Sequence, residues 1–298
     1  MTVPVRRIGI VAKPGLTEAA DLLVEIGTWL SGRGIEPCYE TATAALAGKA
    51  LTGPTCDAAT LGADVQMLLV LGGDGTLLGT AGRLAAGGYD VPVLAVNFGS
   101  LGFLTEVRVT EVHDALERAL DGDAEEERRL MLQATVRRAD GATQQHLALN
   151  DVVFTKGALS RMIDLAAYAD GLLIAYFKAD GLIIASPTGS TAYNLSAGGP
   201  IVHPAVDAVV LTPIAPHTLT NRPVVLPAAA TLEVRAVTQD GHEVRDESYV
   251  TFDGQTGDIL GPGDAVTVQR ARYVLRLLKP ASRGYFEVLR QKLRWAER

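Results

Sequence analysis

Apolar and polar positions follow two different periods along the first hundred residues. Residues 8–12 form a short apolar run, and residues 35–40 form a second strand-like segment. Between them, apolar residues recur at helical spacing from Ala19 to Leu30, and Thr17 is the expected N-cap of that helix. Strands that alternate with helices are typical of a parallel sheet covered by helices. We therefore expect an N-terminal α/β domain.

Two further apolar runs, residues 67–71 and 91–96, carry hydrophobic side chains on consecutive positions. A strand of this kind is covered on both faces, so both runs predict central strands of the parallel sheet. Each run is followed by a glycine-rich turn, residues 72–76 after the first and 97–102 after the second. Ligands bind outside the carboxyl ends of the strands in open α/β sheets, so the two turns mark the expected site.

The pattern changes in the middle of the chain. A helix with one apolar face is expected to begin at Thr110 and to end at residues 121–123. The charged run 125–129 is expected to be a solvated surface. Beyond residue 130, strand-like segments indicate a mostly β half, and residues 282–298 carry the apolar spacing of a closing helix.

The 298 residues exceed the usual size of a single domain. We expect an α/β domain over residues 1–108, with a phosphate-donor site at its glycine-rich turns. A mostly β domain is expected over residues 109–281, and a C-terminal helix over residues 282–298 is expected to return to the first domain.

Composition and charge narrow the class of protein. The chain is 48% hydrophobic and 20% charged, which is typical of a globular protein with a large core. Its 34 acidic and 27 basic residues leave a net charge of −7, which argues against binding to nucleic acid. No apolar run approaches the roughly 20 residues of a membrane helix, and the first run is too short for a signal peptide. We therefore expect a cytoplasmic protein.

The chain has two cysteines, Cys38 and Cys56. Two are too few for a disulfide scaffold, and their spacing is not that of a CxxC metal or redox site. We expect both to be buried, inert thiols.

The first glycine-rich turn holds the most informative residues. Gly72, Gly73 and Gly75 let backbone amides approach a phosphate without a Cβ in the way, and Thr76 follows them. Asp74 lies among them, where a carboxylate fits the role of a base, a Mg²⁺ partner or a ribose hydroxyl partner. A tight turn that Asp74 only closes is the alternative. The glycines match neither the Walker A motif nor the dinucleotide motif GxGxxG.

Residues 180–200 form a second cluster, rich in hydroxyl groups and glycines and poor in charge. Such a composition suits an uncharged polar ligand such as a nucleoside, and Tyr193 offers an aromatic face to a base. A long polar turn region is the alternative. Ser190 has no evident His or Asp partner nearby in the sequence, so a hydrolase nucleophile is not supported.

Together these segments resemble the NAD kinases. The likeness rests on residues 72–76, 97–104, 180–200 and 216–223, which follow one another in the family's order. The resemblance implies a Rossmann-like N-terminal domain, a C-terminal β-sandwich, and transfer of the γ-phosphoryl group of ATP to the 2′-hydroxyl of the adenosine ribose of NAD. It also implies a divalent metal, Mg²⁺ or Mn²⁺, that arrives with ATP, and a homodimer or homotetramer.

The resemblance assigns roles to individual residues. Asp74 falls at the position of the catalytic carboxylate, where it would accept the ribose proton as a general base. Lys13 adds positive charge to the phosphate-donor loop formed by Gly72, Gly73, Gly75 and Thr76, unless it is an ordinary surface lysine. Asp151 stands where the family more often has Glu. The residues implied to contact NAD are Asp74, Gly75, Asn150, Asp151, Arg161, Lys178, Asp180, Thr191, Ala192, Tyr193, Asn194, Leu195, Ser196 and Gln255.

Two alternatives remain beside an NAD kinase. One is a module that senses NAD or NADP without turnover, and the other is a lipid kinase that shares only the glycine–aspartate loop. ATP or polyphosphate as donor, and NAD or NADH as acceptor, are left open. Among the histidines, His203 and His217 are expected to be structural, and His113 and His146 are expected at the surface.

Overall fold

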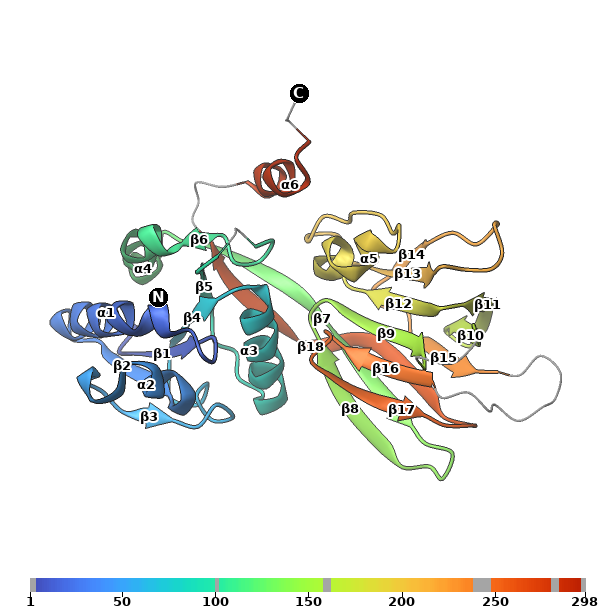
Figure 1. Cartoon of the computed structure of the whole chain (residues 1–298), viewed down its shortest axis with the longest axis horizontal. Helices are drawn as coiled ribbons and strands as arrows, with labels where there is room; N and C mark the ends of the chain where they lie inside the picture. The colour runs from blue at the N-terminus through green and yellow to red at the C-terminus, as the bar shows by residue number, and fades with distance from the viewer. Residues whose placement is uncertain (1–3, 100–101, 158–161, 238–247, 280–283, 296–298) are drawn as a thin grey trace. The chain divides into compact units, whose positions relative to one another are not determined.

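The computed structural model describes residues 4–99, 102–157, 162–237, 248–279 and 284–295 (Figure 1). The chain divides into two compact units, one of residues 1–128 and 275–298 and the other of residues 129–274. Two long strands, β7 (Glu125–Arg137) and β18 (Ala265–Lys279), run from one unit into the other. None of the helices in the described ranges has the length and hydropathy needed to cross a membrane.

The first unit contains a parallel sheet whose central strands are those predicted. Five strands lie in the order β5 (Val93–Asn97), β4 (Met67–Gly72), β1 (Arg7–Ala12), β2 (Glu36–Glu40) and β3 (Thr55–Cys56). Neighbours pair in parallel throughout. Short β6 (Val107–Arg108) and the end of β18 pair in parallel with β5. Every residue of β4 and β5 is buried, as expected for strands covered on both faces.

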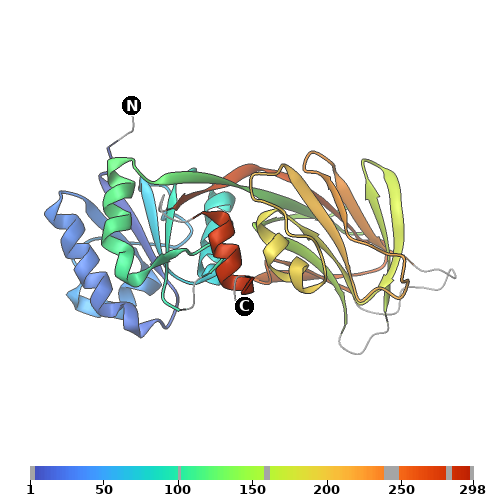
Figure 2. The ribbon, with the colours of Figure 1, turned by 90° about the horizontal axis from the view of Figure 1, so that it is seen from above.

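Helices cover both faces of this sheet, and successive side chains of a strand contact helices on opposite faces. Ile8 and Ile10 of β1 share a core with α1 (Ala20–Gly32) and α4 (Val112–Asp121). These two helices lie on the same side of the sheet in Figure 2. Val11, with the opposite orientation, lies with Leu84 of α3 (Asp74–Gly87). The remaining helical segments are η1 (Thr17–Ala19), α2 (Thr41–Ala47), η2 (Gly48–Ala50), η3 (Val109–Glu111) and α6 (Tyr285–Leu293).

The start of α1 differs from the prediction. Thr17 begins the 3-10 turn η1, which continues directly into α1, and the N-cap of α1 is Ala19 without a side-chain hydrogen bond. Thr17 is therefore not the cap, because the preceding turn satisfies the backbone where a capping side chain was expected.

The expectation of two free thiols is wrong, because Cys38 and Cys56 form a disulfide. The short parallel pairing of β2 with β3 brings their Cα atoms to 6.6 Å. The two cysteines are 18 residues apart in sequence, so only the placement of β3 beside β2 reveals the pair.

The charged run 125–129 is not simply a solvated surface. It begins β7, and within it Arg129 is 2% exposed. Glu127 pairs at 3.2 Å with Lys279, which is itself 3% exposed and also pairs with the buried Glu106. A buried lysine needs such partners, because an unpaired charge away from water is strongly unfavourable.

The boundaries of the compact units differ from the expected domain limits at residues 108 and 281. Helix α4 contacts β5 and β6, so the first unit continues to residue 128. The end of β18 pairs with β5, so residues 275–298 belong to the same unit and the closing helix falls within it.

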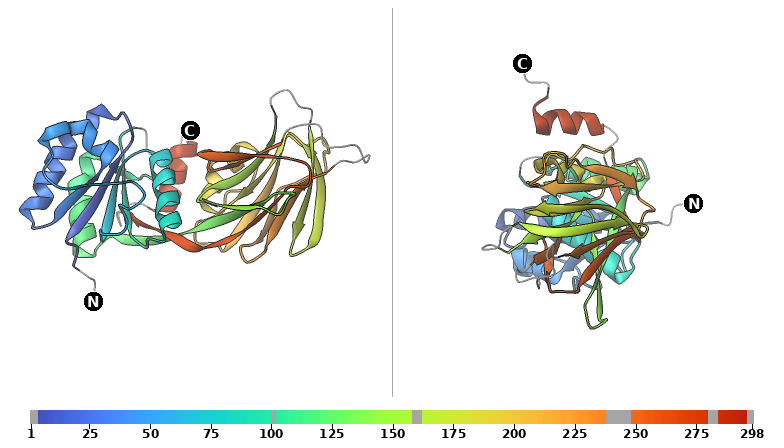
Figure 3. Two further views of the ribbon diagram at one scale, coloured as in Figure 1. Left: turned by 90° about the horizontal axis from the view of Figure 1, so that it is seen from below. Right: turned by 90° about the vertical axis from the view of Figure 1, so that its right-hand side faces the viewer.

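The second unit is the predicted β-sandwich (Figure 3). One antiparallel sheet has the order β14 (Val224–Pro227), β13 (Ala208–Ile214), β12 (Gly181–Ala185), β9 (Asp151–Lys156), β16 (Ser248–Phe252) and β17 (Thr256–Leu260). The other contains β11 (Leu172–Ala179), β10 (Ile163–Ala169), β15 (Leu232–Ala236), β18, β7 and β8 (Thr143–Ala148). Phe154 and Leu182 of the first sheet share one core with Leu165 and Val234 of the second.

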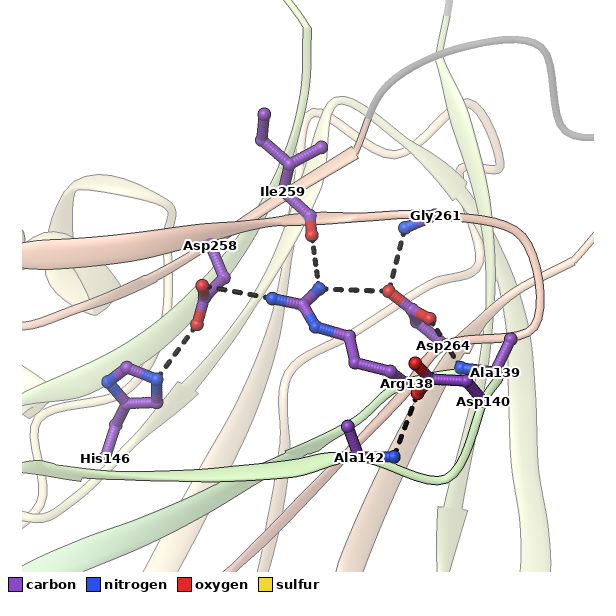
Figure 4. Close-up of polar contacts among 9 residues, drawn as sticks. All are labelled: Arg138, Ala139, Asp140, Ala142, His146, Asp258, Ile259, Gly261 and Asp264. Atoms are coloured by element: carbon purple, nitrogen blue, oxygen red, sulfur yellow. Dashed lines mark hydrogen bonds and ion pairs between the residues drawn. The ribbon is translucent and has the colours of Figure 1, made fainter.

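A polar cluster joins the β7–β8 hairpin of this unit to β17 and β18 (Figure 4). Arg138 pairs with Asp258 at 3.1 Å and with Asp264 at 3.0 Å. His146 lies 2.9 Å from the other oxygen of Asp258, and its ring stacks on Phe252 with 3.9 Å between centroids. His146 was expected at the surface, but the stacking leaves its side chain only 14% exposed.

Candidate active site

The first glycine-rich turn joins the end of β4 to the first turn of α3. Gly72 ends β4, Gly73 is the N-cap of α3, and Asp74 is the first residue of the helix. A Cβ on Gly72 would lie 2.4 Å from Thr76 Oγ1, so packing requires glycine there. A Cβ on Gly73 or Gly75 would meet no atom within 4 Å. The open space at these two positions lets a ligand approach the backbone of the helix N-terminus closely, and the partial positive charge there favours an anion.

The carboxylate of Asp74 is held by the loop that follows β5. Its Oδ1 accepts hydrogen bonds from Thr105 N at 3.0 Å, Thr105 Oγ1 at 2.8 Å and Leu104 N at 3.3 Å. Its Oδ2 accepts one from Phe103 N at 2.9 Å. Asn97, at the end of β5, donates from Nδ2 to the same threonine hydroxyl at 2.8 Å. Protein atoms therefore fix the orientation of this carboxylate.

Gly102 lies directly against the same carboxylate. A Cβ at this position would be 2.0 Å from Asp74 Oδ1 and 2.3 Å from Thr105 Oγ1. Both distances are far inside van der Waals contact. Only glycine allows the loop to close over Asp74 with these hydrogen bonds, so the second glycine-rich turn positions the carboxylate of the first.

An open cavity of about 410 Å³ lies beside the turn. This volume falls within the roughly 300–1,000 Å³ that is usual for small-molecule sites. Two basic side chains line it, Lys13 after β1 and Lys292 of α6. The other lining residues are Leu16, Gly72, Gly73, Asp74, Asn97, Phe98, Gly99 and Gly102. Two lysines beside a helix N-terminus favour an anionic ligand.

In the second unit, the turn between β8 and β9 is held from two sides. Asp253 accepts hydrogen bonds from the amides of Leu149 and Asn150, each at 2.7 Å, and from that of Asp151 at 3.1 Å. Its own amide donates to the Asp151 carbonyl at 3.0 Å. Opposite, Ser186 N donates to the Asn150 carbonyl at 2.8 Å. The backbone that presents Asn150 and Asp151 is therefore rigidly placed.

The two carboxyl groups of this turn are electrostatically unusual. Burial, together with the nearby charge of Asp253, raises the pKa of Asp151 to about 7. Burial also raises the pKa of Asp253, although the three backbone amides that bind it oppose this shift. Asp151 therefore titrates near neutral pH, and its protonated form can donate a hydrogen bond to a ligand.

The hydroxyl-rich segment after β12 is a pair of short helices, η4 (Thr188–Thr191) and α5 (Tyr193–Ser196), rather than a long turn. Part of it faces inward. Ser190 Oγ donates to the Pro187 carbonyl at 2.6 Å and accepts from Val202 N at 3.0 Å. The fully buried Asn194 donates to the Ser190 carbonyl at 3.0 Å and accepts from Thr212 Oγ1 at 2.7 Å. These side chains hold the segment together.

The other predicted residues of this segment lie further out. Tyr193 is 44% exposed, and Ser196 is exposed as well. Thr191 is half-buried, and its hydroxyl donates to the Thr188 carbonyl at 3.3 Å. Ala192 and Leu195 are also half-buried. The aromatic face of Tyr193 is therefore the part of this segment most accessible to a base.

The remaining predicted NAD contacts are more scattered. Lys178 is exposed on β11, and Gln255 is exposed in the turn between β16 and β17. Asp180 pairs with Lys156 at 2.8 Å. Arg161 lies outside the described residues. Asp74 and Gly75 belong to the first unit, and the other described members of the predicted set belong to the second.

Two residues of these sites were not found from the sequence. Asp253 is 102 residues away from Asp151, whose amide it binds, and only its place before Gly254 indicated a turn. Lys292 lies within the predicted closing helix, three and four residues after the buried Leu289 and Val288. That spacing could have indicated a lysine on the inner face of the helix.

Family models match both parts of the chain. The ATP-NAD kinase N-terminal domain matches residues 8–124, and the ATP-NAD kinase C-terminal domain matches residues 149–279. This chain belongs to the NAD kinase family. Among its relatives, the NAD kinase of Geobacter metallireducens is 46% identical over 98% of this chain and 100% of its own length. That of Citrifermentans bemidjiense is 45% identical with the same coverage.

Solved structures of the family share the fold. Yeast NADH kinase complexed with NADH superposes with a TM-score of 0.91 at 24% identity, covering 99% of this chain and 89% of that one. The NAD kinase from Archaeoglobus fulgidus in complex with ATP has a TM-score of 0.74 at 25% identity, covering 97% and 98%. The family and the fold predicted from the sequence are confirmed, and neither a sensing module nor a lipid kinase is favoured.

Proposed function

We propose that this member of the family transfers the γ-phosphoryl group of ATP to the 2′-hydroxyl of the adenosine ribose of NAD, with Asp74 as the general base. The observation that carries the proposal is the fixed carboxylate of Asp74 at the N-terminus of α3, beside a cavity lined by Lys13. Phosphoryl transfer depends mainly on positioning and on charge neutralisation. A glycine-rich helix N-terminus that also carries an oriented carboxylate supports both.

The donor would bind at the glycine turn. A Cβ on Gly73 or Gly75 would meet no atom within 4 Å, so phosphate oxygens could approach the backbone of this turn closely, and Thr76 follows with a hydroxyl group. Among the described residues, no group of three or more His, Cys, Asp or Glu side chains could hold a metal ion. Asp74 supplies the single carboxylate among the described residues that line the cavity. A divalent ion therefore fits this site as part of a metal–ATP substrate, since Mg²⁺ is usually bound through substrate phosphates and one or two carboxylates.

The acceptor would meet residues of the second unit. Asn150 and Asp151 are held rigidly by Asp253, and protonated Asp151 can donate to a ribose oxygen. Tyr193 offers an exposed ring for stacking with adenine. The further proposed contacts are Arg161, Lys178, Asp180, Thr191, Ala192, Asn194, Leu195, Ser196 and Gln255. The side chain of Asn194 is bonded within the unit, so its proposed contact is through the backbone.

One assay tests this function. The purified chain is incubated with each pair of ATP or polyphosphate and NAD or NADH, with Mg²⁺, Mn²⁺ or EDTA, and NADP(H) is measured. We expect NADP to form with ATP and metal and not with EDTA. Tight binding of NAD without NADP formation from any pair would contradict the proposal and support a sensor.

We also propose that the protein is a homo-oligomer that acts in the cytoplasm. Leu172 is 76% exposed and Tyr176 is 57% exposed on β11. Apolar side chains grouped on one strand are typical of association surfaces. Light scattering coupled to size exclusion should give a dimer or tetramer, and a monomer at micromolar concentration would contradict the oligomer.

A further inference from the structure

The C-terminal helix α6 places a lysine at the cavity beside the glycine turn. Lys292 lines this cavity together with Gly72, Gly73 and Asp74. Helix α6 lies beyond residue 279, where the match to the family's C-terminal domain ends.

The position of Lys292 on its helix explains why it faces the protein. Val288 and Leu289 are each 2% exposed, and Lys292 follows them by four and three residues. Residues at these spacings share one face of a helix. Lys292 is accordingly half-buried, whereas Arg290, on another face of α6, is exposed.

The surroundings of Lys292 leave its charge available. Its Nζ lies 5.5 Å from the centre of the Phe103 ring, a cation–π distance. Within the described ranges, no carboxylate forms an ion pair with it. The amide of the same Phe103 donates to Asp74 Oδ2, so the lysine sits next to the loop that orients the proposed base.

We propose that Lys292 binds the phosphate groups of the donor and that α6 thereby completes the ATP site. The inference rests on the proposed function, because it names the ligand of the same cavity. A triphosphate brings several negative charges to a cavity whose described lining already contains the carboxylate of Asp74. Lys13 and Lys292 are the two basic side chains in that lining, so they offset this repulsion from opposite ends of the chain.

The experiment compares Lys292→Met, Lys292→Arg and the control Arg290→Met. Both methionine variants remove a cation from the last turn of α6, so they lose the same favourable interaction with the helix dipole. Binding of a non-hydrolysable ATP analogue with Mg²⁺ is measured by calorimetry for each folded variant, along with KM for ATP and for NAD.

We expect Lys292→Met to weaken binding of the analogue and to raise KM for ATP by about 10–100-fold, the scale of a lost hydrogen bond to a charged group. KM for NAD should change less than about twofold, and the weakening should shrink at high salt. Lys292→Arg should restore most of the affinity, and Arg290→Met should match the unchanged chain.

Unchanged binding of the analogue in Lys292→Met would overturn the inference and leave the lysine a partner of Phe103 alone. An equal loss in both methionine variants would overturn it too, because it would reflect the helix rather than the site. If Lys292→Met does not fold, the folded Lys292→Arg decides the question. We then expect it to bind the analogue nearly as tightly as the unchanged chain and to lose affinity at high salt, whereas an affinity that does not depend on salt would overturn the inference. Failure of the unchanged chain to make NADP refutes the proposed function, whereas the binding comparison judges Lys292 separately.

Discussion

Replacing Gly102 by alanine tests whether the second glycine-rich turn positions the base. The added methyl group would lie 2.0 Å from Asp74 Oδ1 and 2.3 Å from Thr105 Oγ1. These atoms sit on the carboxylate and on the hydroxyl that binds it, so relief of the clash must displace at least one of them by about 1 Å. A misplacement of this size costs on the order of 10²-fold in rate. We expect kcat to fall by about that factor.

The matched control is Gly82→Ala, in the same helix as Asp74, where a Cβ would meet no atom within 4 Å. This change should leave kcat unaltered and stabilise the chain by about 0.5–1 kcal/mol, because alanine favours helix interiors over glycine. The assay is steady-state NADP formation at saturating substrates, with thermal unfolding measured in parallel. If folded Gly102→Ala retains kcat within about threefold of the unchanged chain, the contact with Asp74 has no role in catalysis.

Three further predictions concern the second unit. The pKa of Asp151 is raised from 3.8 to about 7 in the folded chain. Between pH 3.8 and 7 the folded chain therefore binds a proton that the unfolded chain does not bind. The stability that this protonated side chain contributes is lost as pH rises towards 7. At pH 8, Asp151→Asn should therefore have a free energy of unfolding up to about 4 kcal/mol higher than that of the unchanged chain, measured by urea unfolding, whereas at pH 4 the two should be nearly equal. An equal difference at both pH values would contradict the shift in pKa. Tyr193→Ala should weaken NAD binding by about 1–3 kcal/mol in calorimetry, the scale of stacking between a base and an aromatic ring, whereas a large drop in melting temperature with unchanged affinity would make Tyr193 a packing residue. Arg138→Met leaves Asp258 and Asp264 without their shared cation and should lower the free energy of unfolding in urea by about 2 kcal/mol. The control Arg270→Met breaks an exposed pair with Asp207 and should lower it by less than about 0.5 kcal/mol. Equal effects of the two variants would show that the cluster does not contribute to stability.

The parts of the fold that the sequence predicted well are those with a strong periodic signal. Strands β4 and β5 are buried on both faces, so their runs of consecutive apolar residues left little choice. The glycines at positions 72 and 102 likewise carried a signal, because a close approach of other atoms requires them.

The features that were missed depend on contacts between distant segments. The disulfide of Cys38 and Cys56 needs β3 beside β2, which no local pattern predicts. The burial of Arg129 depends on the tertiary packing of β7. Asp253 binds amides from a turn about a hundred residues earlier in the chain. Composition and spacing describe local preferences, so pairs of this kind appear only when the chain is folded.

The central claim is that Asp74 acts as the base rather than as a residue that closes a turn. Asp74→Asn preserves size and most hydrogen-bonding geometry but removes the charge and the proton acceptor. The decisive measurement is kcat for NADP formation by this variant, together with calorimetric affinities for NAD and for a non-hydrolysable ATP analogue. We predict that kcat falls by roughly 10²–10⁴-fold while both ligands still bind. A fall of less than about fivefold, with fold and binding intact, would contradict the account, because asparagine is equally accepted in a turn.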